Sequence, residues 1–378
     1  MTGLGVVTPF GSDLERVWER LLAGEPAIDV SKRFGAHRPP TKAVGEVPET
    51  DCDELRAEFG ATSAPADLRT VFGVAAARRA LAHAGIAPGR HLRAGAVVAS
   101  GPGAHRLEDL VALAAEDGTL DGARLVAALD ATLEATGSAG HGSIHRGSLW
   151  RSSPERPATE IADRFGLGGP VSAITTACAA SLQAIGSAMR EIRSGRADWM
   201  LAGGADSMVD PLGLVFFVLL GASATEEGKR ACRPFSRRRT GIVMGEGAGI
   251  AVLESEAHAK ARGARILAEV AGYGSTLDAY RVTAPHPQGR GAAGAMTRAL
   301  ADARMSLDDV DLVSAHATGT KLNDPAEARA IREVFGARAS KVAVSSGKSV
   351  MGHLLAAAGA VSFASATLSV ARGIVPPT

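Results

Sequence analysis

The sequence has 378 residues, enough for one large domain or two fused halves with a substantial core. Its 41 basic and 40 acidic residues leave a formal net charge of +1, so neither a nucleic-acid-binding face nor an acidic tail is indicated. Glycine is abundant, with 45 residues, and aromatic residues make up only 4%, which predicts a core of closely approaching backbones.

Short apolar runs alternate with amphipathic stretches, the pattern of an α/β protein. In chain order, the pattern predicts helices at 14–23 and 75–84, a strand at 94–99, a helix at 179–193, strands at 200–202 and 249–254, a helix at 291–303, a strand at 312–315, a helix at 326–334, a strand at 341–344 and a helix from 352 onward. Segment 101–155 has the poorest periodicity, and we expect a surface excursion there.

Two of the predicted helices look like counterparts. One begins at Cys178, carries apolar residues at 182, 185, 189 and 192 on one face, and ends at Gly195. The other begins at His353, carries apolar residues at 354, 357, 361 and 368, and ends at Gly373. Each follows a β-like segment. We therefore predict an internal duplication, with an N-terminal half at 1–260 and a C-terminal half at 261–378.

Two apolar stretches raise the question of a membrane. Residues 212–224 are too few to span a bilayer, and residues 354–371 are mostly Ala, Gly and Ser. We expect the second stretch to be a packed central helix. No signal-peptide pattern opens the chain, and the three widely spaced cysteines form no C-x-x-C pair, which argues against disulfides and zinc. The expectation is a cytoplasmic protein without membrane contact.

Cys178 has the setting of a nucleophile, although a free cysteine is more often an inert small hydrophobe. At a helix start, unpaired N–H groups and the helix dipole are expected to lower the thiol pKa. The small neighbours Ala177 and Ala179 leave room for a thioester. Cys52 and Cys232 lack this setting, and we interpret them as structural.

Two histidines and a lysine accompany the thiol. His316 follows a predicted strand, while Lys348 and His353 lie five residues apart around a turn and a helix start. Singly, each is explained as a structural or solvated residue. Together with Cys178 they suit carbanion chemistry on a thioester, because two neutral imidazoles can donate hydrogen bonds to a developing enolate oxygen. A helix-start position favours the neutral form of His353.

Several motifs that would indicate a cofactor are incomplete. Gly347-Lys348-Ser349 resembles the end of a phosphate-binding loop, but Val342 occupies the required earlier glycine position. The G-x-G-x-G run from Gly245 precedes a strand rather than a helix. No nucleotide, flavin or metal cofactor is therefore indicated.

These motifs together resemble the β-ketoacyl-acyl-carrier-protein synthases, the elongating condensing enzymes of fatty acid and type II polyketide assembly. The resemblance runs over nearly the whole chain, through residues 2–9, 175–181, 202–206, 233–236, 245–249, 316–324 and 348–359. It implies a five-layer αβαβα thiolase-like fold of two related halves, normally a dimer. By motif position, Cys178 is similar to the acyl acceptor, His316 and His353 to the pair that promotes malonyl decarboxylation, and Lys348 to the active-site lysine.

The resemblance implies supporting roles for five further residues. Asp324 and Glu327 correspond to acidic residues that organise the lysine and the His316 loop, but they are equally well explained as N-terminal charges of the helix that follows. Phe217 falls where the family lines its acyl pocket. Thr318 and Thr320 correspond to hydroxyls near the pantetheine arm.

The implied reaction is acyl transfer from an acyl carrier protein to Cys178, followed by condensation with a malonyl carrier protein. The implied assembly is a homodimer, or a heterodimer with a paralogous subunit. One alternative is a non-catalytic partner resembling a chain-length factor, a class that typically lacks the nucleophile. Another is a degradative thiolase, which needs a second cysteine as a base, and none follows Cys232. The Ala/Gly/Arg-rich composition and the altered pocket segment slightly favour a polyketide or other specialised pathway.

Three departures from the family pattern are visible. Ala317 stands where a glycine usually follows the histidine. A longer polar insertion at 137–156 replaces the usual segment before the nucleophile, so acyl-chain length cannot be carried over. The sequence stops at Thr378, before the strand pair and Gly-Phe-Gly-Gly-x-Asn loop of the family. We expect a fragment rather than a paralogue that lacks part of its site.

Overall fold

The computed structural model describes residues 1–33, 43–60, 67–102 and 153–378. The expected excursion at 101–155 and the insertion at 137–156 lie almost wholly outside the described residues. The described chain is a layered α/β structure, as the alternating pattern predicts.

A five-stranded sheet forms the base of the N-terminal half. Its strand order is β1 (Gly3–Val7), β8 (Gly247–Glu254), β6 (Trp199–Asp206), β4 (Ala94–Ser100) and β5 (Val171–Ile174). β8 runs antiparallel to β1 and β6, whereas β6, β4 and β5 are parallel. Every residue of β4 and β6 is buried, because helices cover both faces of the sheet. The predicted strands at 94–99, 200–202 and 249–254 lie inside these longer strands.

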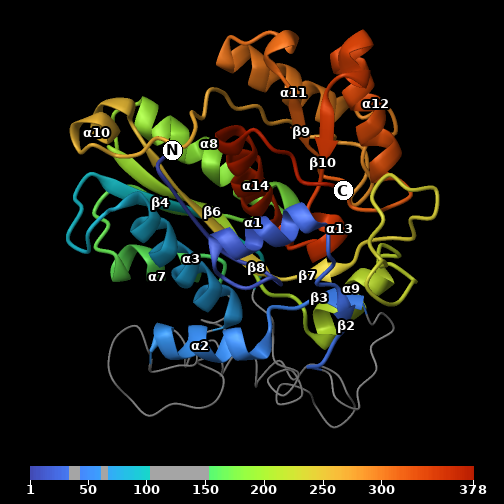
Figure 1. Ribbon diagram of the computed structural model, residues 1–378, viewed down its shortest axis with the longest axis horizontal. Helices are drawn as coiled ribbons and strands as arrows, with labels where there is room; N and C mark the ends of the chain where they lie inside the picture. Colours follow the sequence, from blue (N-terminus) through green and yellow to red (C-terminus); the bar gives the residue numbers. More distant parts are fainter. Residues whose placement is uncertain (34–42, 61–66, 103–152) are drawn as a thin grey trace, which may run out of the picture.

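Figure 1 shows the layers of the fold. Helices α3 (Leu68–Ala84) and α7 (Arg156–Arg164) cover one face of the sheet, and α8 (Ala180–Arg193) and α14 (Ala358–Arg372) cover the other. Beyond them lie the parallel strands β9 (Leu312–Ser314) and β10 (Ala343–Ser345), and then α11 (Arg290–Ala303) and α12 (Asn323–Phe335). The arrangement is the five-layer αβαβα thiolase-like fold.

The two halves repeat one close backbone contact. A Cβ at Gly5 of β1 would lie 1.9 Å from the carbonyl oxygen of Ala76 in α3. A Cβ at Gly274 would lie 2.1 Å from the carbonyl oxygen of Ala295 in α11. In both halves, a helix rich in alanine therefore sits directly on an extended segment that has no side chain at the contact. This repeat supports the duplication, while the boundary at 260 stays a prediction.

The apolar run near the C-terminus forms a central helix. Residues Leu355–Arg372 are long and apolar enough to cross a membrane by length and composition, with a mean hydropathy of 1.3, and 61% of them are buried. This is the one such helix among the described residues. α14 packs against α8, β8 and β9, so protein contacts account for much of its apolar surface.

Several boundaries differ from the prediction. α3 begins at Leu68 rather than 75, because the Asp67 side chain accepts a hydrogen bond from the Thr70 N–H and caps the helix earlier. The helix expected from 352 begins as a 3₁₀ turn at Leu355–Ala357 and becomes α-helical only at Ala358. The remaining elements are α1 (Leu14–Ala23), β2 (Asp29–Val30), β3 (Ala43–Gly45), α2 (Glu49–Phe59), the 3₁₀ turn Ala177–Ala179, α9 (Pro211–Leu219), β7 (Met244–Gly245), α10 (Glu256–Ala261), the 3₁₀ turns Leu307–Asp309 and Gly336–Ser340, and α13 (Lys348–Met351).

Candidate active site

The thiol and the two histidines converge at the centre of the molecule. The Sγ atom of Cys178 and one ring nitrogen each of His316 and His353 lie within 4.8 Å of one another. The two imidazole rings meet edge to face, with centroids 5.3 Å apart. Cys178 comes from the turn before α8, whereas both histidines come from the C-terminal half. Cys178 and His316 keep some exposed surface, so a thioester can reach them, while His353 is 1% exposed.

The backbone holds His353 in a defined orientation. Its N–H donates to the carbonyl of Val243 at 2.7 Å, and its carbonyl accepts from the N–H of Gly245 at 2.9 Å. Its Nδ1 accepts a hydrogen bond from the N–H of Leu355 at 3.0 Å. In a neutral ring the proton must then reside on Nε2. Nε2 is buried and has no protein partner within the described chain, which leaves this N–H available to a substrate.

Both imidazoles are neutral at physiological pH. Burial, together with the charge of Lys348, lowers the pKa of His316 to about 3. Burial also lowers the pKa of His353 well below its usual value, with further contributions from Lys348 and His316. The neutral state of His353 agrees with the expectation, but its main cause is burial rather than a position at a helix start. His353 lies two residues before the 3₁₀ turn, so the prediction that it starts a helix is wrong.

The pKa of the Cys178 thiol differs from the expectation. Burial raises the pKa of the Cys178 thiol to about 11; the charge of Lys348 and the Cys178 backbone N–H oppose this rise, and the charge of Asp206 adds to it. The predicted lowering of the thiol pKa is therefore wrong. The residue lies in a 3₁₀ turn of three residues, and the regular helix begins only at Ala180. Burial outweighs the field of the helix, and the thiol is protonated at neutral pH.

Lys348 supplies a buried positive charge beside the site. Its side chain is 5% exposed, and no carboxylate lies within ion-pair distance of it among the described residues. Burial lowers the pKa of Lys348, and the negative charge of Glu327 is the main opposing influence. The lysine therefore acts on its neighbours through its field rather than through an ion pair.

Glu327 and Asp324 hold the loop that carries His316. The two carboxylate oxygens of Glu327 accept hydrogen bonds from the N–H groups of His316 at 2.6 Å and Ala317 at 2.7 Å. Asp324 accepts from the N–H of Phe235 at 2.7 Å and from that of Gly319 at 3.1 Å. The two carboxylates therefore do more than place negative charge near the start of α12. Together they accept hydrogen bonds from four backbone N–H groups around the site.

Strained backbone surrounds the reactive residues. Four non-glycine residues adopt positive φ angles here: Ala177 at 51°, Phe235 at 58°, Ala317 at 41° and Leu355 at 48°. Ala177 and Ala317 adjoin Cys178 and His316, and Leu355 follows His353 by two residues. Left-handed backbone is costly for residues with a Cβ and persists only where the surroundings enforce it. The alanine in place of the usual glycine is thus accommodated, with its N–H held by Glu327.

The comparisons with known proteins agree with this geometry. Residues 1–259 match the model of the β-ketoacyl synthase N-terminal domain, and residues 267–378 match that of the β-ketoacyl synthase C-terminal domain. The chain belongs to the β-ketoacyl synthase family. It is thus a condensing enzyme of the acyltransferase type.

Two relatives and two solved structures illustrate the family. The chain is 38% identical over 389 residues to the 3-oxoacyl-[acyl-carrier-protein] synthase 2 of Vibrio harveyi, and 36% identical over 384 residues to the nodulation protein E of Rhizobium sp. (strain N33). Both alignments cover 100% of this chain and 87% of the relative. The solved structures are the AntDE:AntF complex of a type II polyketide ketosynthase with its acyl-carrier protein (TM-score 0.80, 33% identity) and the ishigamide ketosynthase/chain length factor (TM-score 0.82, 32% identity). Each structural match covers 100% of this chain and 87% of the other.

The residues expected to contact substrate lie near Cys178, His316 and His353 of the synthase. Phe217 of α9 packs against a buried cluster that includes Met244, which pairs with the His353 backbone, and Leu355. The hydroxyls of Thr318 and Thr320 lie 3.0 Å apart in the loop after His316. Their contacts with an acyl chain and a pantetheine arm stay predictions.

The spacing of the thiol and imidazoles would also suit a soft metal ion, but the hydrogen bonding does not. A metal-ligating histidine normally donates its other ring N–H to an acceptor. His353 does the opposite, since its Nδ1 accepts from Leu355 and its Nε2 therefore holds the proton. The buried charge of Lys348 further disfavours a cation. The donor set fits hydrogen-bond donation to a substrate oxygen better than metal binding.

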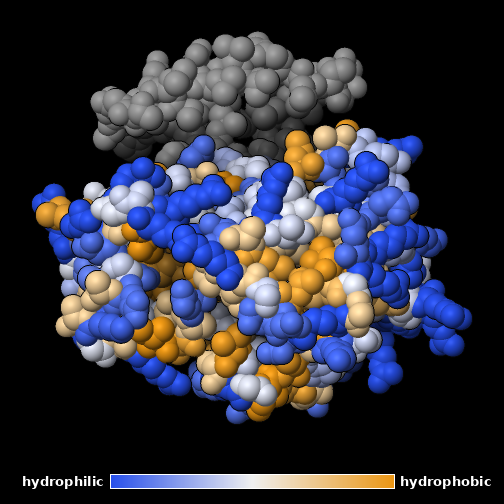
Figure 2. Space-filling model, turned by 90° about the horizontal axis from the view of Figure 1, so that it is seen from above, coloured by the Kyte–Doolittle hydropathy of each residue, from blue (hydrophilic) through white to orange (hydrophobic). Residues whose placement is uncertain are grey.

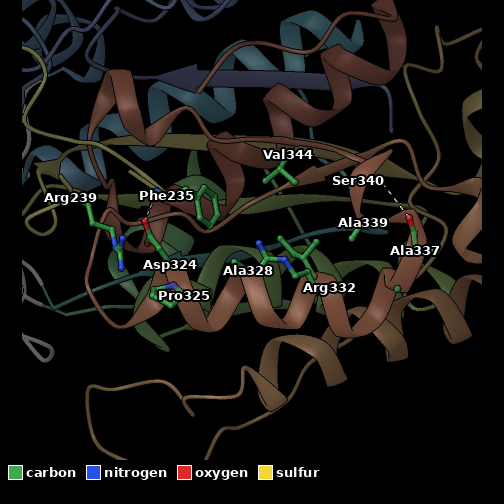
Figure 3. Close-up of a pocket in the computed structure, with 12 residues that line it drawn as sticks. Phe235, Arg239, Asp324, Pro325, Ala328, Arg332, Ala337, Ala339, Ser340 and Val344 are labelled. Carbon is green, nitrogen blue, oxygen red and sulfur yellow. Dashed lines mark hydrogen bonds between the residues drawn. The ribbon is translucent and has the colours of Figure 1, made fainter. Parts of the chain in front are cut away.

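A cavity of about 670 Å³ lies beside the site, between α12 and β10. Figure 3 shows Val344 on one side of it and Ala328 and Arg332 of α12 on the other. Asp324 lines this cavity and is joined to the His316 loop by the hydrogen bond that it accepts from the Gly319 N–H. Cys178 and the two histidines do not line it, so the cavity does not identify the reaction centre.

Two buried carboxylates near the site escaped the sequence analysis. Asp206 ends β6 and is 1% exposed; Glu246 lies between β7 and β8 and is fully buried. Burial raises the pKa of Asp206 to about 6, against hydrogen bonds from Ala356, Ser207 and Gly101. The signal that could have revealed Asp206 is an acidic residue that ends an otherwise apolar strand.

Proposed function

We propose that this chain is a 3-oxoacyl-acyl-carrier-protein synthase in fatty acid or type II polyketide biosynthesis. In this reaction, an acyl group on Cys178 condenses with a malonyl group held by a carrier protein, and carbon dioxide is lost. The observation that carries the proposal is the convergence of the Cys178 sulfur with two neutral imidazoles, one of which has an unpartnered Nε2–H.

The first half-reaction loads Cys178. The sulfur attacks the thioester carbonyl of the acyl carrier protein, the bond from carbon to the carrier sulfur breaks, and the proton of Cys178 ends on the departing carrier thiol. Because the thiol is protonated beforehand, the neutral ring of His316 must relay this proton as the bond forms, since Nε2 of His353 already carries a proton and its Nδ1 accepts from Leu355. The positive charge of Lys348 favours the thiolate that appears during transfer.

The second half-reaction forms the new carbon–carbon bond. The bond between the malonyl carboxylate and its α-carbon breaks, carbon dioxide leaves, and the electron pair moves into the thioester to form an enolate. His353, with its proton on Nε2, donates to the enolate oxygen, and His316 stabilises it from the second side. The α-carbon then attacks the acyl carbonyl, and Cys178 leaves as a sulfur anion that regains a proton.

The partner in the active assembly is a second subunit, either an identical copy or a paralogue. β5 ends the sheet and has no strand partner on its outer side among the described residues. Val171 of β5 and Leu182 of α8 are 40% and 45% exposed, which is unusual for apolar side chains in such elements. The nucleophile turn directly follows β5, so a subunit docked here would enclose Cys178. The solved ketosynthase/chain length factor is consistent with such an arrangement.

The carrier protein would approach over a basic loop at 229–239. Arg239 donates to the carbonyls of Thr320 and Lys321, which places the loop beside the Thr318–Thr320 hydroxyls. Arg237, Arg238 and Lys321 are exposed. Figure 2 shows hydrophilic side chains crowding the right-hand side of the molecule, the side on which Figure 1 places this loop. Such cations suit the phosphate of a phosphopantetheine arm.

We also propose a cytoplasmic location, supported by three cysteines that are all free. The chain-length-factor alternative is less well supported, since Cys178 is present and meets both histidines. The thiolase alternative is less well supported, because both halves of the chain match β-ketoacyl synthase domains.

Mass spectrometry after incubation with acyl carrier protein tests the proposal. We expect an acyl adduct on the peptide that holds Cys178, and release of carbon dioxide and product when malonyl carrier protein is added. Cys178→Ser should lose the adduct, while the matched change Cys232→Ser, at a buried cysteine, should retain it. An adduct on another peptide, or condensation that survives in Cys178→Ser, would exclude the proposal. Activity that appears only after a paralogous subunit is added would establish the heterodimer.

A further inference from the structure

The end of β6 is the point where the two reactive turns meet. A Cβ at Gly204 would lie 2.6 Å from the carbonyl oxygen of Ala356 and 2.9 Å from the Cβ of Ser181. Ala356 belongs to the turn after His353, and Ser181 lies three residues after Cys178. Ser181 in turn accepts a hydrogen bond from the N–H of Ala360 at 2.9 Å. A side chain that fixes the end of β6 therefore affects the positions of both the Cys178 turn and the His353 turn.

Asp206 is the side chain at this strand end. Its Oδ2 accepts from the N–H of Ala356 at 3.1 Å, and its Oδ1 accepts from the N–H of Ser207 at 2.9 Å. The Gly101 N–H is a third donor to the same carboxylate. No cation lies within ion-pair distance of Asp206 in the described chain. A buried carboxylate held only by backbone N–H groups is costly, and neutral acceptors can satisfy such groups without a charge.

The contact with Ala356 leads directly to His353. Ala356 follows Leu355, which has a positive φ of 48° and whose N–H donates to Nδ1 of His353. That hydrogen bond decides which ring nitrogen carries the proton. If the Ala356 N–H lost its acceptor, the strained Leu355 turn could relax and His353 would lose its defined tautomer.

We propose that Asp206 is a positioning residue of the condensation: its buried carboxylate anchors the turn that holds His353 with its proton on Nε2. This inference rests on the proposed function of His353. The charge of Asp206 has a second consequence, because it opposes ionisation of the Cys178 thiol. The other charged and titratable groups that face the pair are Lys348, His316 and His353 in the site and Arg69 from α3.

The test compares Asp206→Asn with Asp206→Glu and with Glu254→Gln. Asparagine turns an amide NH₂ toward at least one of the three backbone donors and removes the charge. Glutamate restores the charge. Glu254 is a matched control, since its side chain is a buried carboxylate on β8 of the same sheet, bonded to Arg262 and His258 away from the site. Two rates are measured: alkylation of Cys178 by iodoacetamide as a function of pH, and condensation in a single turnover from acylated enzyme.

We expect the two rates of Asp206→Asn to change in opposite directions. Alkylation at about pH 8 should become about threefold or more faster, because each unit by which a thiol pKa falls raises the thiolate fraction about tenfold. Condensation should fall by about tenfold or more, because His353 is no longer oriented. Asp206→Glu should return alkylation to the wild-type pH profile, and Glu254→Gln should leave both rates within about twofold of wild type.

General loss of structure would also expose the buried Cys178 thiol and speed its alkylation, so both rates are measured at a temperature where circular dichroism shows each variant to be fully folded. The proposal is overturned if both rates of the folded Asp206→Asn variant stay within about twofold of wild type, or if the two rates change in the same direction. If the asparagine variant does not fold, an alkylation profile of Asp206→Glu that differs from wild type overturns it equally. Failure of the proposed function is distinguishable, since the wild-type protein itself would then form no acyl adduct on Cys178.

Discussion

The N–H of Leu355 donates to Nδ1 of His353 at 3.0 Å, and this contact sets the proton of the imidazole on Nε2. The donor belongs to a residue with a positive φ angle, so the backbone adopts a costly conformation at the place where it orients the ring. The buried, unpartnered Nε2–H then has a defined direction. A hydrogen-bond donor that is oriented before substrate arrives stabilises a developing oxyanion without reorganisation.

The variant His353→Asn should separate decarboxylation from acyl transfer. The oxygen of the introduced amide can still accept from the Leu355 N–H, but the shorter side chain has no donor at the Nε2 position. We expect malonyl decarboxylation to fall by about 100-fold or more, the usual cost of losing one oxyanion donor. Carbon dioxide release measures this rate, and the acyl adduct on Cys178 is the control. Decarboxylation within about tenfold of wild type would contradict the assigned role.

Glu327→Gln should reduce catalysis through the His316 loop. The glutamine keeps one carbonyl acceptor but turns an NH₂ group toward one of the N–H groups of His316 and Ala317. We expect kcat to fall by about 10- to 100-fold with a smaller change in KM, because the imidazole is displaced rather than removed. Glu333→Gln, at an exposed position of the same helix, is the control. Equal activities of the two variants would show that the loop does not depend on Glu327.

Substitutions of Ala317 test the backbone strain next to His316. Ala317→Val places a β-branched residue at φ 41° in a buried position, and we expect the free energy of unfolding to fall by about 2 kcal/mol or more. Ala317→Gly relieves the strain but adds freedom to the unfolded chain, so its net change should stay within about 1 kcal/mol. Denaturant unfolding measures both. A valine variant as stable as wild type would mean that the strain is absent.

The buried imidazoles should make the protein sensitive to acid. The folded pKa of His316 is about 3, whereas the unfolded pKa is about 6.5. Between these values the unfolded chain binds more protons than the native protein, so stability is present above about pH 6.5 and is lost as the pH falls toward 3. We expect His316 to contribute a loss of about 2 kcal/mol between pH 7 and 5. His316→Gln should show a smaller difference in unfolding free energy between these two pH values; an unchanged difference would contradict a buried neutral ring.

Much of the fold could be predicted because its signals are local. The apolar runs at 94–99 and 249–254 and the helix at 14–23 are confirmed, since burial on one or both faces leaves a periodic pattern. The early boundary of α3 was missed because an aspartate cap decides it. Leu182 belongs to the predicted apolar face of α8, yet it is 45% exposed, beside the sheet edge that is open in the described chain.

The sequence by itself determined that a thiol, two imidazoles and a lysine would belong to one site, because their residue types and order have few other uses together. Only the tertiary structure decided the protonation of the thiol, the contact that orients His353 and the involvement of Asp206. These depend on how much water the surrounding chain excludes and on which distant N–H groups converge on one carboxylate. Desolvation and long-range hydrogen bonds join residues more than 100 positions apart, and no local pattern encodes them.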